Sequence, residues 1–442
     1  MNHARLALFA GAVVASGTAA SAVVACDVSV GTSGTGAAPS AGHGAGSVAG
    51  SGGDGSGGAG GGFSLTTGSG PTGPCNQDPG VDGDGDGWTP AEGDCDDCDP
   101  TVNPGAIDVL AAVDGGPPQV VDHDCDGKAE LPAPCDDGLA LDDADPLDGA
   151  RALELCQQAD AAPASKKDLR WGVLSARYVG ANGVDARVPG LQVGLFDGFG
   201  PQVHVQAGAR MLALSSGHAR LPDTPGACGS PSCTTTSNVD PPSGFPQIVP
   251  SCDGGTIIND DIALEITLRA PTNASGYAFS FKFHSFEFPE WVCTPYNDQF
   301  IALVSPAPAG SIHGNVSFDG LANPVSVNLA YFDVCDPAGQ DGFALNCGGT
   351  ANPSCPTRPS PYCPNGAAEL QGTGFDLWGH SGATRWLTTR APVKGGAELT
   401  IRFAVWDTAD QALDSTVLVD RFSWLADGTA VDVGTDPADN PK

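Results

Sequence analysis

The stretch IALEITLR at residues 262–269 decides the fold class, because apolar and polar side chains alternate along it. The stretches YAFSFKFH at 277–284 and LTIRFAV at 399–405 repeat this pattern. A period of two places every second side chain on the same face of a strand. Antiparallel sheets that bury one face on a core have this pattern. We therefore predict a mostly β fold, an antiparallel, jelly-roll-like β-sandwich with Pro- and Gly-rich loops between its strands.

The composition of the 442-residue chain limits its function. Asp and Glu total 52 against 19 Lys and Arg, a net charge of −33. This balance argues against nucleic acid as a partner, because phosphates are bound by Lys and Arg. It favours cations as partners, or a well-solvated surface. The 62 glycines and 37 prolines argue against a helix-dominated fold.

The N-terminal residues have the pattern of an export signal. A short basic start is followed by an apolar stretch, residues 6–25, which leads into Cys26. This resembles a bacterial lipoprotein signal peptide, which implies that Cys26 becomes a lipid-modified N-terminus attached to a membrane. The alternative is an ordinary secretory signal cleaved after ASA at 20–22. We favour the outer membrane or cell surface, although Asp27 leaves the inner membrane open.

Changes in composition divide the chain into five segments. Residues 27–74 contain 18 glycines and cannot bury a core. The acidic residues are concentrated in the segment that follows. The predicted segments are the signal peptide (1–25), a Gly/Ser-rich flexible tether (26–74), an Asp-rich cation-binding module (75–140), a helix followed by the β-sandwich (141–430) and a disordered tail (431–442).

The cysteines indicate an oxidising compartment, since 15 is a large number for a reduced cytosolic protein. Besides Cys26, six lie at 75–156 and eight at 228–363. Each number is even, which predicts two modules with separate disulfides and leaves their connectivity open. Between the modules, Asp145 is placed to cap a short helix with Pro146 in its first turn.

The densest group of chemically active side chains is DGDGDGW at 82–88. Carboxylates at alternate positions, separated by glycine, allow the chain to wrap around a hard cation, and Ca²⁺ takes 6–8 oxygen ligands. The stretch matches the first half of an EF-hand loop. The twelfth position, however, is Gly93, and its neighbours Glu92 and Asp94 are the possible substitutes for the usual glutamate. The alternative is an acidic spacer without a specific site.

Two more acidic blocks follow, DCDDCDP at 94–100 and DHDCDG at 122–127, with PGA at 104–106 between them. The four blocks in this order resemble the MopE-type metal-binding motif, although the cysteine after PGA is absent and Cys98 is extra. Carboxylates are hard ligands and His123 is the one imidazole among them, so we predict Ca²⁺, with copper as a minor alternative. The predicted ligands are Asp82, Asp84, Asp86, Glu92, Asp94, Asp96, Asp97, Asp99, Asp122, Asp124 and Asp126.

Two blocks in the β region carry a second resemblance. They are SFEFPEWVC at 285–293, followed by YNDQF at 296–300, and WDTADQALDS at 406–415. These resemble the choice-of-anchor L domain over about residues 150–425, which implies a surface-displayed β-sandwich. If their acidic residues converge, they form a possible second metal site; the alternative is that each caps a turn or pairs with an Arg. These residues are Glu287, Asp298, Asp407 and Asp414.

No motif favours an enzyme. The eight histidines include no HExxH pair, and Glu287 and Glu290 on one loop would be an unusual pair for glycoside hydrolysis. We expect an exported, membrane-anchored lipoprotein whose calcium-stabilised β-sandwich has a structural, adhesive or ligand-binding role, with a surface glycan or a protein as ligand. The alternative functions are a carbohydrate-binding module, for which Trp291, Trp378 and Trp386 are candidates, and a secreted hydrolase.

Overall fold

The computed structural model describes most of the chain from residue 78 onward. The signal peptide, Cys26 and the tether lie outside the described residues. All described residues belong to one compact unit. The described ranges are 78–111, 116–184, 186–233, 239–250, 252–328, 332–335, 365–378 and 381–442.

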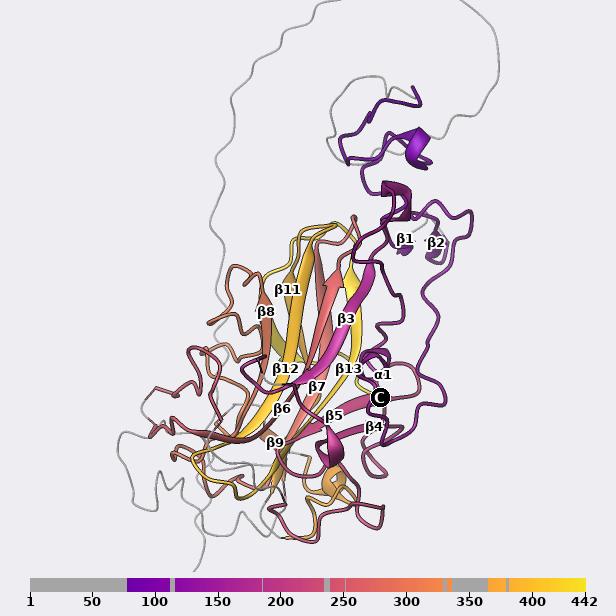
Figure 1. Cartoon of the computed structure of the whole chain (residues 1–442). Helices are drawn as coiled ribbons and strands as arrows, with labels where there is room; N and C mark the ends of the chain where they lie inside the picture. The colour runs from indigo at the N-terminus through magenta and orange to yellow at the C-terminus, as the bar shows by residue number, and fades with distance from the viewer. Residues whose placement is uncertain are drawn as a thin grey trace, which may run out of the picture. The chain divides into compact units, whose positions relative to one another are not determined.

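Two antiparallel sheets form the predicted β-sandwich (Figure 1). The first sheet has the order β3 (Gly172–Val179), β6 (Ile258–Arg269), β12 (Glu398–Thr408) and β8 (Gln299–Ser305). The second has the order β14 (Gly434–Pro437), β11 (Leu387–Pro392), β7 (Gly276–Ser285), β13 (Ser415–Leu425), β5 (Met211–Ser215) and β4 (Val193–Phe196). In addition, β10 (Gly382–Thr384) pairs with β7 and with β9 (Phe332–Cys335). The three alternating stretches of the sequence are β6, β7 and β12, as predicted.

Aromatic side chains from both sheets meet in the core. The ring of Phe279 on β7 lies 5.0 Å from that of Phe403 on β12, and Phe281 lies 5.2 Å from Phe300 on β8. All four side chains are fully buried. Burying one such side chain contributes roughly 1.5–3 kcal/mol, so these contacts hold the two sheets face to face.

Strand β7 is buried on both faces, whereas the alternation predicted one polar face. The polar alternates Lys282 and His284 are completely buried. The His284 ring lies between Phe199 and Phe375, and the Lys282 ammonium pairs with Glu369 at 2.6 Å. The outer face is therefore covered by a second apolar cluster, to which both neighbouring strands and loops distant in the sequence contribute.

Short elements complete the fold. The predicted helix is α1 (Pro146–Arg151), and the Asp145 side chain caps it by accepting a hydrogen bond from the Leu147 N–H at 2.9 Å. Single 3-10 turns are η1 (Pro90–Glu92), η2 (Lys166–Asp168), η3 (Gly190–Gln192) and η6 (Ala368–Leu370). In the described part of the Asp-rich segment, β1 (Val109–Ala111) pairs with β2 (Gln119–Val121) as a hairpin.

The tail at 431–442, predicted to be disordered, contains a strand instead. Residues of β14 pair with β11, from Gly434 opposite Arg390 to Pro437 opposite Leu387. An unpaired edge of β11 offers backbone groups that a following segment can satisfy. A sequence pattern of four residues is too short to reveal this pairing.

The disulfides between described cysteines stay within the two predicted groups. They are Cys95–Cys125 and Cys135–Cys156 in the first, and Cys228–Cys233 and Cys252–Cys293 in the second.

Candidate cation-binding sites

The residues 82–88 form a tight loop. Gly85 and Gly87 have φ of 86° and 96°, a conformation that glycine adopts without steric cost. Their N–H groups donate to the two carboxylate oxygens of Asp82, at 2.6 and 2.9 Å. As the spacing predicts, Asp82, Asp84 and Asp86 each bring one oxygen to within 4.8 Å of the others.

Two more aspartates reach this loop from the next acidic block. Asp97 accepts a hydrogen bond from the Gly83 N–H at 2.9 Å. Asp94 is only 6% exposed, and burial together with the charges of Asp86, Asp84 and Asp97 raises its pKa to about 6. One buried carboxylate oxygen each of Asp84 and Asp94, Oδ2, has no hydrogen-bond partner. We call Asp82, Asp84, Asp86, Asp94 and Asp97 the loop-1 site.

The other candidates in this block have different surroundings. Glu92 pairs with Lys166 at 2.9 Å, and the hydrogen bond from Lys166 lowers the pKa of Glu92. Of the two neighbours of Gly93, Asp94 rather than Glu92 therefore interacts with the loop carboxylates, through the charges of Asp84 and Asp86. Asp99 caps a local turn by accepting bonds from the N–H and hydroxyl of Thr101, while Asp96 is exposed.

A second group of carboxylates forms around the hairpin. Asp108, Asp122 and Asp124 bring oxygens to within 4.8 Å of one another, and we call them the loop-2 site. The Asp122 oxygen Oδ1 is buried without a partner, and burial raises the pKa of Asp124. The predicted ligand Asp126 instead lies 3.6 Å from the Lys128 ammonium.

Asp108 is a site residue that the sequence did not predict. Its two carboxylate oxygens accept bonds from the N–H groups of His123 (2.7 Å), Asp124 (3.2 Å) and Glu130 (2.9 Å). It stands alone among apolar neighbours just after PGA at 104–106, where the resemblance leads one to expect a cysteine. An acidic residue in place of that cysteine was the only available signal.

Asn103 joins the loop-1 site to the sandwich. Its side chain is fully buried, and its amide Nδ2 donates to Asp86 Oδ2 at 2.7 Å. Its oxygen Oδ1 accepts from the Gly105 N–H at 2.9 Å and from the Thr272 hydroxyl at 2.6 Å, just after β6. Its backbone N–H donates to the His123 carbonyl at 2.9 Å. One residue, through its side chain and its backbone N–H, thus connects both Asp-rich loops and the β-sandwich.

The four acidic residues predicted for a second site are all buried within the sandwich. Asp298 donates its N–H to Glu287 Oε2 at 3.2 Å, and Asp407 lies beside both Asp298 and Asp414. We call these four residues the acid row, since each lies beside the next; no three of them bring oxygens within 4.8 Å of one another, as the acids of the two Asp-rich loops do. In the described part of the chain none of the four pairs with an Arg, Lys or His, so pairing with an Arg does not explain them.

Burial dominates the electrostatics of this row. It raises the pKa of Glu287, Asp298 and Asp407 well above the ordinary carboxyl range, and neighbouring carboxylates raise these pKa values further. Burial raises the pKa of Asp414 to about 7. Such a row of uncompensated acids is stable only if protons or cations neutralise it.

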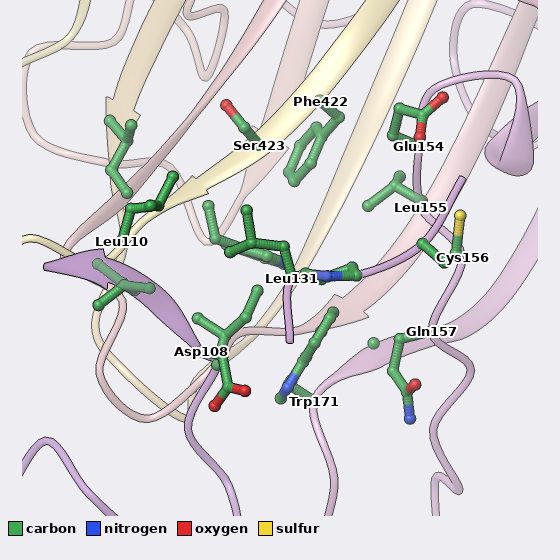
Figure 2. A pocket seen from close by; sticks show the side chains of 18 of the residues that line it. Asp108, Leu110, Leu131, Glu154, Leu155, Cys156, Gln157, Trp171, Phe422 and Ser423 are labelled. Atoms are coloured by element: carbon green, nitrogen blue, oxygen red, sulfur yellow. The ribbon is translucent and has the colours of Figure 1, made fainter. Parts of the chain in front are cut away.

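A groove of about 410 Å³ lies near the hairpin (Figure 2). Apolar side chains, among them Leu131, Leu155 and Trp171, line much of it. Glu154 lies at its wall, where burial and the nearby Asp136 raise the pKa of Glu154 to about 7.

The three tryptophans predicted as candidates for glycan contact are distributed differently. Trp386 is only 4% exposed and belongs to the outer apolar cluster, so it is unsuitable. Trp291 packs edge-on against Tyr296 and is half-buried, whereas Trp378 is exposed. Trp171 and Trp424 of the groove were not among the candidates.

The family model of the choice-of-anchor L domain matches residues 179–424, more than half of the chain. The chain belongs to the choice-of-anchor L family. This family membership indicates a surface-anchored bacterial protein with a β-sheet fold. The match includes all four interior acids of the choice-of-anchor L domain and leaves out both Asp-rich loops. No curated protein and no solved structure matches the chain. Within the described residues, no helix is sufficiently long and apolar to cross a bilayer.

Proposed function

We propose that this choice-of-anchor L protein is an exported bacterial lipoprotein, attached to a membrane through Cys26, that displays a calcium-stabilised β-sandwich. Its role at the cell surface is structural, adhesive or ligand-binding. The family membership supports display at the surface, and the Asp-rich loops support the requirement for a cation.

The observation that carries the calcium proposal is the environment of Asp94. It is nearly buried beside Asp84 and Asp86, and both Asp94 and Asp84 keep a buried oxygen without a hydrogen bond. Unpaired buried carboxylates are costly, and a hard cation with oxygen ligands removes that cost. Copper is less suitable, because carboxylates predominate at both loops.

The Asp-rich segment has little else to stabilise it. Its buried apolar side chains in the described part of 78–145 are Trp88, Val102 and Ala106. So small a core does not hold a segment of this length without disulfides or metal ions. Binding of Ca²⁺ only to the folded state would stabilise it by about 2.7 kcal/mol at a concentration 100 times the Kd.

Thermal unfolding with and without chelator tests this proposal. We expect EDTA to lower the Tm, and added CaCl₂ to restore it more effectively than MgCl₂ or CuSO₄. Asp94→Asn should raise the Kd for calcium, obtained from the dependence of the Tm on calcium concentration, at least about tenfold, the equivalent of 1.4 kcal/mol. The control Asp99→Asn, in the same block but in a local turn, should respond like the wild type. An unchanged Tm after exhaustive chelation would refute the proposal.

The lipid anchor has a separate test. Cys26→Ala should move the exported protein from the membrane fraction to the soluble fraction, because attachment through acyl chains needs the modified cysteine. Retention of the variant in the membrane fraction would contradict the anchor.

A carbohydrate-binding role is the second candidate, favoured by the groove. Trp171 offers aromatic surface there, and Gln157 and Glu154 offer polar groups (Figure 2). Trp424 also lines the groove. Glycan-array binding that Trp171→Ala abolishes and Trp378→Ala preserves would support it. Absence of any glycan binding by the wild type would reject it. A hydrolase role has no comparable support in the described residues.

A further inference from the structure

We propose that the interior of the sandwich contains a dehydrated divalent-cation site centred on Asp407, separate from the Asp-rich loops and selective for Ca²⁺. The site joins the two sheets at one end of the sandwich. It does not depend on the function proposed for the Asp-rich segment.

Strand register brings the acids of this site together. Asp407 lies at the end of β12, where Trp406 pairs with Gln299 at the start of β8, directly after Asp298. In the other sheet, Ser415 at the start of β13 pairs with Ser285 at the end of β7. Asp414 directly precedes Ser415, and Glu287 follows Ser285 by two residues. Four strand ends from both sheets therefore converge here.

Hydrogen bonds across the sheets fix Asp298. Its Oδ1 accepts from the Thr408 N–H at 2.9 Å, and its Oδ2 accepts from the Ser415 hydroxyl at 2.7 Å. These partners are more than 100 residues away in sequence, so Asp298 does not simply cap a local turn. Its carboxylate is held by both β12 and β13.

The buried oxygens around Asp407 lack donors. Asp407 is fully buried and lies beside Asp298, Asp414 and the Ser216 hydroxyl, yet neither of its carboxylate oxygens has a hydrogen-bond partner of acceptable geometry. Asp414 Oδ1 is also buried without a partner, and so is the amide oxygen of Asn297, a residue whose backbone carbonyl accepts from the Thr408 hydroxyl at 2.8 Å. All of these atoms are acceptors. A group of unpartnered acceptors is the arrangement that a cation, rather than a water molecule or an apolar group, satisfies.

The ligand chemistry indicates the class of ion. Every available atom is a carboxylate, amide or hydroxyl oxygen, which suits Ca²⁺ or Mg²⁺ rather than a soft metal. Ca²⁺ accepts a mixed, irregular oxygen set, whereas Mg²⁺ requires octahedral geometry and retains water. A site this deeply buried has little room for retained water, and this favours Ca²⁺.

Counting bound ions by native mass spectrometry tests the site with the full mature chain in calcium. Asp407→Asn should bind one Ca²⁺ fewer than the wild type. The matched control is Asp420→Asn, a fully buried acid whose oxygens accept bonds from the Gln206 and Arg421 N–H groups; it should retain the wild-type count. Asp94→Asn should lose an ion only at the loop-1 site, so failure of the interior site and failure of the loop-1 site are distinguishable.

Hydrogen exchange of the wild-type protein is a second measurement, and it tests the site even if Asp407→Asn does not fold. In the wild type, calcium should slow hydrogen exchange of the Thr408 and Ser415 amides at least about tenfold, and Asp414→Asn should reduce this effect. Equal ion counts in the wild type and Asp407→Asn, or exchange at Thr408 and Ser415 that is independent of calcium, would overturn the proposal and leave proton sharing among the acids as the explanation.

Discussion

Replacing Asn103 with alanine should destabilise the protein far more than its polar character suggests. The side chain is fully buried and makes three hydrogen bonds, to Asp86, Gly105 and Thr272. Asn103→Ala leaves the Gly105 N–H and the Thr272 hydroxyl without their acceptor, and removes a donor from the Asp86 carboxylate.

The magnitude follows from those orphaned groups. A buried polar group that loses its partner costs about 1–3 kcal/mol. Two such donors, together with the weakened Asp86 contact, give an expected loss of about 3–5 kcal/mol, which is at the upper end for single substitutions. The loss should be accompanied by weaker calcium binding, because Asn103 positions Asp86 within the loop-1 site.

Urea unfolding in saturating calcium, followed by tryptophan fluorescence, measures this loss. Thr101→Ala is the control, since it removes a hydroxyl from the same segment that bonds only to the neighbouring Asp99; it should cost less than about 1 kcal/mol. A loss below 1 kcal/mol for Asn103→Ala would show that the connection between the loops and the sandwich does not stabilise the fold.

Two further predictions concern the sandwich and its surface. Because the folded-state pKa of Glu154 is about 7 against an ordinary 4.5, the folded chain holds a proton that the unfolded chain releases, and stability is lost as the pH rises through this window. After allowance for the partial exposure of Glu154, the loss of unfolding free energy is about 1–2 kcal/mol. In urea titrations at pH 5 and 8, Glu154→Gln should reduce the difference in unfolding free energy between the two pH values by this amount. The same difference in the variant as in the wild type would show that Glu154 does not cause the loss. Lys282→Met should lower the unfolding free energy by about 2–4 kcal/mol, because it breaks the buried contacts with Glu369 and the Thr384 carbonyl; stability equal to the wild type would contradict this.

Local alternation was sufficient to locate the central strands but not to order them. β6 and β12 are identified by their own period of two, yet their pairing, with Leu264 opposite Phe403, joins segments far apart in the chain. The same limit explains Lys282 and His284. Their alternation with phenylalanine indicates a polar face, and only the loops that pack over it make that face interior.

The Asp-rich loops show which ligands of a site can be predicted from the local sequence. Asp82, Asp84 and Asp86 were predictable because one short loop supplies all three. The choice between Glu92 and Asp94 as a ligand could not be predicted, because it depends on Lys166, which is 74 residues from Glu92 and pairs with it. The one local signal for Asp108, an acidic residue in place of a cysteine, did not indicate its partners, because the hairpin brings it to Asp122 and Asp124.

The calcium content of the purified mature protein tests the central claim most directly. After calcium loading and dialysis into metal-free buffer without chelator, elemental analysis should find at least two Ca²⁺ per chain, one for each Asp-rich loop, with the content reduced in Asp94→Asn and unchanged in Asp99→Asn. Calcium no higher than in the dialysis buffer would contradict the account, and so would equal content in both variants.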